Sequence, residues 1–304
     1  MLLDKLFISK EEMNRKINML SLFDGISVAQ LALKELNIPV NNYYASEIDK
    51  NCIKVTQHHF PDTIQLGDVC DIDGTTLPII DLMVFGSPCQ NLSSLRKRRK
   101  GLNSEDSGLF FEALRLLKEI KPKYFLMENV GSMSKHDKKV ITDLLGVKPI
   151  EINSNLLSCS NRSRLYWTNI PNVAVPENKN ILLQDCFEGG YFDRTKSNAI
   201  LTKNIPYTKA GLIRYIKRSI GQVVFHDKAF AELPKSEKLK RIYPMPLDEV
   251  KSLYRLFTVE EQEQCQTLPI GYVSEILKKT PATHSIGNSF TKDVIKHILS
   301  FAQF

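Results

Sequence analysis

The first 130 residues alternate between short apolar runs and amphipathic segments, and this alternation restricts the fold more than any other feature of the chain. Four apolar runs have the length of buried strands: 17–23, 43–46, 79–86 and 123–130. Three segments between them carry apolar residues at helical spacing: 27–36, 49–60 and 107–120. Strands and helices that alternate in this way form a parallel sheet covered on both faces. The sequence therefore predicts an α/β fold with a mostly parallel sheet.

The second half of the chain has a different pattern. Six prolines lie between residues 171 and 246, and the apolar runs there are short. Helical spacing returns in three later segments, at 247–256, 258–268 and 291–304. We therefore expect two domains: a large one formed by residues 1–169 with about 266–304, and a small one formed by about 170–265.

Positive charge is concentrated in one segment of the predicted small domain. The chain has a formal net charge of +7. Residues 203–241 contain ten lysines and arginines but three acidic residues, so this segment carries the whole excess. Aromatic residues interleave with the basic ones, as in surfaces that bind a polyanion. A solubilising basic face explains the charge about equally well.

Several classes of protein are disfavoured by composition. The N-terminal segment "MLLDKLFISKEEMNRK" is too charged for a signal peptide or membrane anchor, so we expect a cytoplasmic protein without membrane association. The six cysteines form no C-x-x-C pair and no Cys/His cluster at zinc-ligand spacing. We therefore expect neither a metal site nor a disulfide framework.

Polar residues at the ends of predicted strands indicate a nucleoside site. Parallel sheets bind ligands at the carboxyl ends of their strands. The first strand runs into Asp24-Gly25, where a glycine allows a tight turn beside a cofactor. The second runs into Glu47, an acid that can accept both hydroxyl groups of a ribose. Asp68 would occupy the next position on this edge.

Two further strand ends carry groups suited to covalent chemistry. Cys89 follows soon after the buried run "IIDLMVFG", and Glu128 lies near the end of the run "KYFLMENV". A thiolate is a nucleophile, and a carboxyl in a partly apolar pocket can keep a proton and donate it. Together they suit attack on an electron-poor ring whose nitrogen becomes protonated. The alternative, a merely buried thiol, explains Cys89 less well because it does not account for the proline, the strand end and Glu128 together.

Eight motifs of the chain resemble, in order, those of the cytosine-C5 DNA methyltransferases. They read "SLFDGIS", "ASEID", "GDV", "GSPCQNLS", "MENV", "NRSRLYW", "RLFTVEEQEQCQTLPIGY" and "HSIGNSF". The wording is most similar to the catalytic domain of the animal de novo enzymes. The resemblance extends from Ile17 to the C-terminus and omits only the basic segment. It implies a Rossmann-like, S-adenosylmethionine-dependent methyltransferase fold with a small target-recognition domain.

The resemblance also implies a role for each matching residue. Ten would bind S-adenosylmethionine: Phe23, Asp24, Gly25 and Ile26 along its methionine and sugar, Glu47 and Ile48 at the ribose, Asp68 and Val69 at the adenine, and Asn288 and Ser289 beside its carboxylate. Four would act on the base: Cys89 attacks C6 of cytosine, Glu128 protonates or hydrogen-bonds N3, and Arg164 with Arg162 holds O2 and the adjacent backbone. The sequence thus predicts a DNA (cytosine-5-)-methyltransferase.

Double-stranded DNA is the partner that this activity implies. The target cytosine must leave the base stack, which costs a few kcal/mol. Basic residues in two regions are candidates for DNA contacts: Arg96, Lys97, Arg98, Arg99 and Lys100 after the cysteine motif, and Arg214, Lys217 and Arg218 in the basic segment. Such an enzyme works alone or beside a cognate restriction endonuclease, and neither this choice nor the oligomeric state follows from the sequence.

Departures from the family pattern are few, and two other functions stay open. Ser27 replaces the second glycine of the first motif, Asn161 replaces the glutamine of the arginine motif, and Ser87 replaces a proline common in bacterial members. A tRNA cytosine methyltransferase would use the same chemistry, but the chain lacks the Cys-Phe-Thr sequence of that subgroup. A catalytically silent DNA-binding relative is disfavoured because Cys89 and Glu128 are both present.

Overall fold

The computed structural model of the chain describes residues 15–86, 105–201 and 206–304. These residues form two compact units. Unit 1 comprises residues up to Ile152, with Ser163–Val175 and Ile295–Phe304, and unit 2 comprises Asn153–Arg162 and Pro176–Val294. Residues 266–294, expected with the catalytic domain, thus pack in unit 2. The predicted functional division of the chain stays a prediction.

A seven-stranded sheet of order β3-β2-β1-β4-β5-β7-β6 forms the centre of unit 1. Its strands are β1 (Ile17–Leu22), β2 (Val40–Ser46), β3 (Ile64–Gln65), β4 (Leu82–Phe85), β5 (Tyr124–Val130), β6 (Ile150–Asn153) and β7 (Ser163–Thr168). The pairs among β1 to β5 are parallel, whereas β7 runs antiparallel to β5. The predicted Rossmann-like α/β fold is confirmed.

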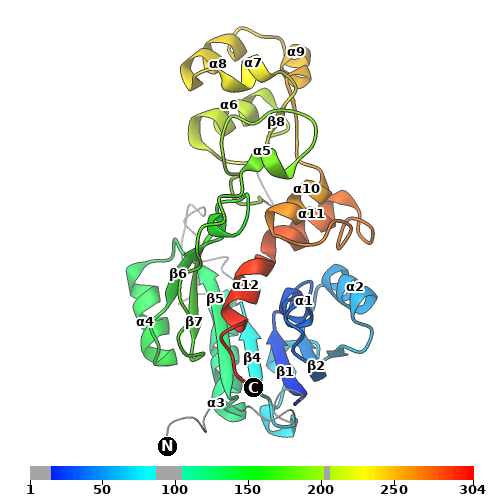
Figure 1. The fold of residues 1–304 in the computed structure, drawn as a ribbon, viewed down its shortest axis with the longest axis vertical. Helices are drawn as coiled ribbons and strands as arrows, with labels where there is room; N and C mark the ends of the chain where they lie inside the picture. The colour runs from blue at the N-terminus through cyan, green and yellow to red at the C-terminus, as the bar shows by residue number, and fades with distance from the viewer. Residues whose placement is uncertain (1–14, 87–104, 202–205) are drawn as a thin grey trace, which may run out of the picture. The chain divides into compact units, whose positions relative to one another are not determined.

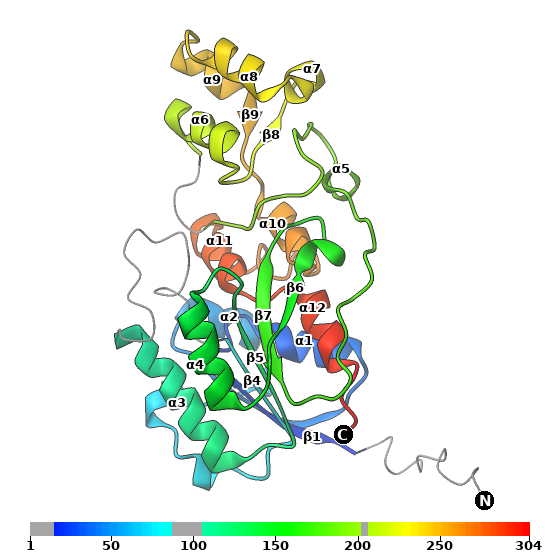
Figure 2. The same cartoon turned by 90° about the vertical axis from the view of Figure 1, so that its left-hand side faces the viewer.

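Helices cover both faces of this sheet. They are α1 (Val28–Glu35), α2 (Lys50–His59), α3 (Glu105–Ile120), α4 (Lys135–Leu145) and, continuing from unit 2, α12 (Lys292–Leu299). Figures 1 and 2 show α1 and α2 over one face and α3 and α4 over the other. Because β4 and β5 are buried on both faces, they read as continuous apolar runs in the sequence. Phe85, Met127 and Trp167 pack in the core beneath α3 and α4.

Unit 2 is built mainly of short helices. They are α5 (Leu183–Cys186), α6 (Lys209–Arg218), α7 (Lys228–Glu232), α8 (Lys235–Ile242), α9 (Leu247–Ser252), α10 (Val259–Cys265) and α11 (Lys279–Asn288). Strands β8 (Val224–Phe225) and β9 (Tyr254–Arg255) form a small antiparallel pair. Leu212, Tyr215, Phe225, Phe230 and Ile242 form the centre of its apolar core.

The structure corrects parts of the predicted element order. The segment 247–256 was expected to be one helix, but α9 ends at Ser252 and Tyr254–Arg255 pair as β9. The sequence patterns also did not predict β6, β7 or α4, because these elements are short or become stable only through tertiary pairing. None of the helices in the described part of the chain combines the length and the apolarity that a membrane crossing requires.

Candidate active site

The carboxyl ends of four parallel strands lie in one row. Leu22 pairs with both Ser46 and Phe85, and Phe85 pairs with Met127. The next residue on each strand is therefore Phe23, Glu47, Gly86 or Glu128, all at the same edge of the sheet (Figure 1). This register brings the predicted cofactor residues and the predicted acid of unit 1 to one edge, which is where ligands bind in such folds.

The turn after β1 winds tightly through three residues with left-handed backbone angles. Phe23, Gly25 and Ser27 have φ values of 54°, 61° and 53°. Ser27, which replaces the second glycine of the family motif, thus keeps the conformation that a glycine would adopt most readily. Its hydroxyl compensates by donating a hydrogen bond to the Asp24 carboxylate and lying 3.0 Å from Oγ1 of Thr56. The serine is therefore compatible with the turn.

Asp24 is a buried carboxylate held by hydroxyl groups. Its side chain accepts hydrogen bonds from Ser27 and from the Tyr43 hydroxyl at 2.6 Å. Burial disfavours the charged form and raises the pKa of Asp24 to about 6, although the hydroxyl donors oppose this effect. Asp24 therefore helps to fix the turn, with Ile26 buried behind it, rather than presenting an open carboxylate.

The raised pKa of Asp24 predicts a specific pH dependence of stability. Between the ordinary aspartate pKa of 3.8 and the folded pKa of about 6, the native protein binds more protons than the unfolded chain. Stability therefore falls as pH rises through this window, by at most roughly 3 kcal/mol for the full shift. Asp24→Asn removes this contribution. We expect the stability of the variant relative to the wild type to increase between pH 4 and pH 7.

Urea unfolding of both proteins across this pH range measures the difference. Asp248→Asn is the matched control, because the Asp248 side chain is 99% exposed. A wild-type to Asp24→Asn difference that does not change with pH would contradict the expected burial cost.

Glu47 is oriented by backbone donors at the end of β2. Its Oε2 accepts from the Gly25 N–H at 2.8 Å, and its Oε1 accepts from the Ile48 and Asp49 N–H groups, each at 2.8 Å. These bonds fix the plane of the carboxylate and use three of its roughly four lone-pair sites, so Oε2 can accept one further hydroxyl. Ile48 is 70% exposed and offers an apolar surface beside this carboxylate. A ribose and its base fit this combination.

The third predicted cofactor position lies at the helical turn η2 (Val69–Asp71). Asp68 is exposed, and its Oδ1 accepts from the Cys70 N–H at 3.0 Å. The Val69 side chain is buried in the core of unit 1, so only its backbone is suited to contact an adenine. A Cβ placed on Gly25 would meet nothing within 4 Å, which leaves space beside the turn.

Glu128 and Arg164 form a buried pair on neighbouring strands. Arg164 pairs with Val130 and Glu128 pairs with Tyr166, so both side chains project from the same face of the sheet. Arg164 Nε lies 2.8 Å from Oε1 of Glu128, and the two side chains are 15% and 11% exposed. The contact is an ion pair. Among the described residues, Oε1 of Glu128 accepts no hydrogen bond of good geometry. The two residues are far apart in the sequence, and the antiparallel pairing of β7 with β5 brings them together.

Cys89 and the basic residues Arg96, Lys97, Arg98, Arg99 and Lys100 lie outside the described residues. Their roles therefore stay predictions from the sequence. The described strand that precedes them, β4, is buried along its whole length and ends at the same sheet edge as β5.

Three predicted residues belong to unit 2 and are linked to each other there. Arg162 is buried, and its terminal nitrogens donate to the carbonyl groups of Gly287 at 3.1 Å and Ser289 at 2.7 Å. These carbonyls flank the end of α11, where Asn288 is exposed and Ser289 is buried. Arg162 thus positions the Asn288-Ser289 motif, a contact that the sequence alone did not indicate. Its predicted contact with DNA is untested.

The basic segment separates into exposed and structural side chains. Lys217, Arg218, Lys235, Lys240 and Arg241 are exposed, and Arg214 is partly exposed. Three lysines donate to backbone carbonyls of unit 2: Lys209 to Tyr243 and Met245, Lys238 to Ala231 and Leu233, and the exposed Lys235 to Lys217. Only some of the basic residues in the segment are therefore available to bind a polyanion.

Comparison with known proteins identifies a family domain in the first half of the chain. Residues 17–148 match the model of the C-5 cytosine-specific DNA methylase family. An orphan methyltransferase of Bacillus phage SPR, M.SPRI, is 36% identical over 163 residues, which are 50% of this chain and 37% of that protein. The type II methyltransferase M1.ScrFI of Lactococcus lactis subsp. cremoris is 35% identical over 161 residues, which are 50% of this chain and 41% of the relative.

The similar region is thus well under half of each curated relative. Over this region, the resemblance to the cytosine-C5 DNA methyltransferases is confirmed. A solved structure, that of the Entamoeba histolytica methyltransferase EhMeth, has a TM-score of 0.67 and covers 95% of this chain and 98% of its own, at 15% sequence identity. At this identity the likeness concerns the fold alone.

Proposed function

We propose that this chain, whose residues 17–148 match the C-5 cytosine-specific DNA methylase family, transfers a methyl group from S-adenosylmethionine to C5 of a cytosine in duplex DNA. One observation carries the proposal. The four strand ends in register hold Glu47, oriented by three backbone N–H groups, at the same edge as Glu128, paired with Arg164. Glu47, which would bind the ribose, and Glu128, which would act on N3, thus lie at one sheet edge.

The residues of the chain divide the chemistry between them. The Cys89 thiolate attacks C6 of a flipped cytosine, and Glu128, protonated when the base is bound, donates its proton to N3, so that C5 gains nucleophilic character. C5 takes the methyl group. A base then removes the C5 proton, the Cys89 thiolate leaves C6, and N3 returns its proton to the Glu128 carboxylate, which restores the aromatic ring. Arg164, which lies beside Glu128, would orient the same base at O2.

S-adenosylmethionine supplies an electrophilic methyl group when it is bound. Glu47 would accept hydrogen bonds from the ribose, Ile48 would contact the sugar and base, and Asp68 with the Val69 backbone would hold the adenine. Phe23 to Ile26 would line the remainder along the turn after β1. The resemblance gives Asn288 and Ser289, whose backbone Arg162 fixes, the role of binding the cofactor carboxylate.

A tRNA cytosine methyltransferase is the runner-up, since fold and chemistry would be the same. Transfer of tritium from labelled S-adenosylmethionine to duplex DNA and to tRNA distinguishes the two. We expect label in DNA, with bisulfite sequencing reporting modified cytosines in one sequence context. Label in tRNA alone would overturn the DNA assignment, and DNA binding without methylation of any sequence would overturn the enzyme assignment.

The exposed lysines of the basic segment should contribute to DNA affinity through phosphate contacts. Each such contact contributes about 0.9 to the slope of log affinity against log salt concentration. We therefore expect the triple variant Lys217→Gln, Lys228→Gln, Lys240→Gln, at three exposed lysines, to flatten this slope by up to about 2.7. Fluorescence anisotropy of a labelled duplex over a salt series measures it.

A matched triple variant separates location from net charge. Lys118, Lys135 and Lys148 are exposed lysines of unit 1, and changing them to glutamine removes the same charge. The slope should change little in this control. If both triple variants gave the same slope, the basic segment would be a solubilising surface.

A further inference from the structure

A cluster of charged side chains in unit 2 takes no part in the chemistry described above. The Asp193 carboxylate accepts a hydrogen bond from the Tyr215 hydroxyl at 2.6 Å and from Arg194 Nε at 2.8 Å. Lys238 Nζ lies 3.8 Å from Asp193 Oδ2 and also donates to two backbone carbonyls. The side chains of Asp193 and Lys238 are 8% and 5% exposed. Buried ion pairs contribute little net stability, so this cluster is a candidate for a role other than stabilising the fold.

The backbone that carries this cluster is anchored at both ends. Tyr191 exchanges two backbone hydrogen bonds with Phe225, at 2.8 and 2.9 Å. Ser197 donates to the Cys159 carbonyl and accepts from the Asn161 N–H. Asp193 and Arg194 lie between these anchors and are packed against α6 through Tyr215. Side chains held in this way are pre-organised for recognition.

The guanidinium of Arg194 is held at one edge by Asp193 and on one face by the Tyr215 ring. Nε and Nη2 donate to the two oxygens of Asp193, at 2.8 and 3.3 Å. Cζ lies 4.1 Å from the centroid of the Tyr215 ring. An arginine has five N–H donors, and the bonds to Asp193 use two of them. The outer edge, formed by Nη1 and the second N–H of Nη2, can therefore present a parallel pair of donors.

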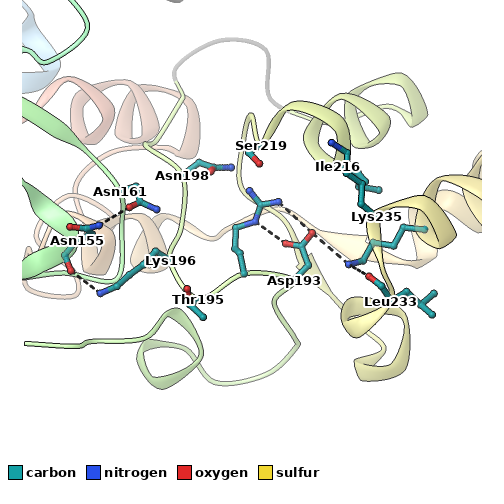
Figure 3. Close-up of a pocket in the computed structure, with 12 residues that line it drawn as sticks. Asn155, Asn161, Asp193, Thr195, Lys196, Asn198, Ile216, Ser219, Leu233 and Lys235 are labelled. Atoms are coloured by element: carbon teal, nitrogen blue, oxygen red, sulfur yellow. Dashed lines mark hydrogen bonds and ion pairs between the residues drawn. The ribbon is translucent and has the colours of Figure 1, made fainter.

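This arginine lines a polar pocket of about 710 Å³ within unit 2. Asn155, Asn161, Thr195, Asn198 and Ser219 also line the pocket, and Lys235 lies at it from α8 (Figure 3). The Arg194 side chain keeps 18% of its surface accessible. Exposed Lys217 and Arg218 on α6 supply further positive charge in the same unit.

We propose that Arg194 reads a guanine of the DNA target site through this outer N–H edge, with Asp193 as its positioning residue. A bidentate arginine matches O6 and N7 of guanine in the major groove. A phosphate contact is the weaker interpretation. Asp193 neutralises the positive charge of Arg194, which a phosphate contact needs, but leaves the outer N–H donors of the guanidinium available for a base. The inference rests on the proposed function and adds a recognition residue that the sequence patterns did not identify.

The protonation state of Asp193 supports this geometry. Burial alone would raise its pKa, but the hydrogen bonds and charges of Arg194, Tyr215 and Lys238 outweigh burial and lower the pKa below its ordinary value. Asp193 is therefore ionised near neutral pH, and its hydrogen bonds with Arg194 persist over the pH range in which methylation would be measured.

The test is a methylation assay on a duplex library with random bases around a central cytosine, read by bisulfite sequencing. We expect the wild-type protein to require guanine at one position. Arg194→Lys keeps the charge but loses the fork, and should reduce the preference at that position alone by about 5- to 150-fold. Arg115→Lys is the matched control, because Arg115 is also held by carboxylates, those of Glu112 and Glu119, but lies in unit 1. Its library preferences should equal those of the wild type.

A modified base tests the same contact without changing the protein. Replacing that guanine by 7-deazaguanine removes the N7 acceptor, so the wild-type rate should fall toward that of Arg194→Lys, while the variant, whose ammonium lacks the parallel pair of donors, should be affected less. If Arg194→Lys unfolds, Asp193→Asn is used in its place and should weaken the same preference.

Three outcomes would count against the inference. An unchanged guanine preference in a folded Arg194→Lys protein, or an unchanged wild-type rate with 7-deazaguanine at every guanine of the site, would overturn it while leaving the proposed function intact. Failure of the wild-type protein to methylate any library member would overturn the proposed function and this inference together.

Discussion

Cys89→Ala should abolish methyl transfer, with a rate loss on the order of 10⁴-fold or more. Without the thiolate no covalent bond forms at C6, and C5 of cytosine is then too weak a nucleophile to take the methyl group. Folding should be little affected, since one small side chain is replaced by another. The measurement is tritium transfer to duplex DNA, at equal concentrations of folded protein.

A mechanism-based probe distinguishes loss of the nucleophile from loss of binding. A duplex carrying 5-fluorocytosine at the target position cannot release a proton from C5 after methyl transfer, so the bond to Cys89 should persist and yield a protein–DNA adduct. The wild-type protein should form this adduct and Cys89→Ala should not, although it still binds DNA.

Cys70→Ala is the matched control, because Cys70 is an exposed cysteine of unit 1. It should methylate DNA and form the adduct at the wild-type rate. Adduct formation by the Cys89→Ala protein would exclude Cys89 as the nucleophile.

Much of unit 1 could be predicted because its signals are local. The burial of β4 and β5 on both faces requires continuous apolar runs, and these runs are visible in the sequence. The turn residues follow from strand order, since parallel strands bring Asp24, Glu47 and Glu128 to one edge. Sequence patterns thus sufficed to predict the fold where the alternation of strands and helices determines which strands lie side by side.

Contacts between distant segments could not be predicted in the same way. The Glu128–Arg164 pair depends on the antiparallel register of β7 on β5, and the segment "SRLYWT" carries no pattern that fixes its partner. The Asp193–Arg194 cluster depends on α6 and α8 packing around an irregular segment. Charge counting assigned Lys238 to the basic surface, yet its side chain is 5% exposed and holds carbonyls of unit 2.

Glu128→Gln should lower the rate of methyl transfer by about 10² to 10⁴-fold, the usual range for loss of a general acid. The amide retains the size of the carboxyl but cannot supply a proton to N3. DNA affinity should change little, because the side chain lies on a buried strand and contributes no phosphate contact. Single-turnover transfer of tritium at saturating DNA measures the chemical step.

The ion pair with Arg164 makes a structural effect of this variant measurable as well. Leaving one member of a buried pair without its partner is destabilising, by up to about 3 to 5 kcal/mol when the charge is fully uncompensated. The glutamine oxygen can still accept from Arg164, so we expect a smaller loss of about 1 to 3 kcal/mol. Urea unfolding at pH 7 measures this loss separately from the rate.

A second substitution separates the two roles of Glu128. Arg164→Met in the Glu128→Gln background removes the uncompensated guanidinium and should recover part of the lost stability, while the rate stays low because no acid is restored. Glu112→Gln, which loosens an ion pair with Arg115 on α3, is the matched control and should keep the wild-type rate. If recovered stability in the double variant were accompanied by recovered activity, the uncompensated Arg164 guanidinium rather than a missing acid would explain the loss in Glu128→Gln, and the proton donor to N3 would have to be sought elsewhere.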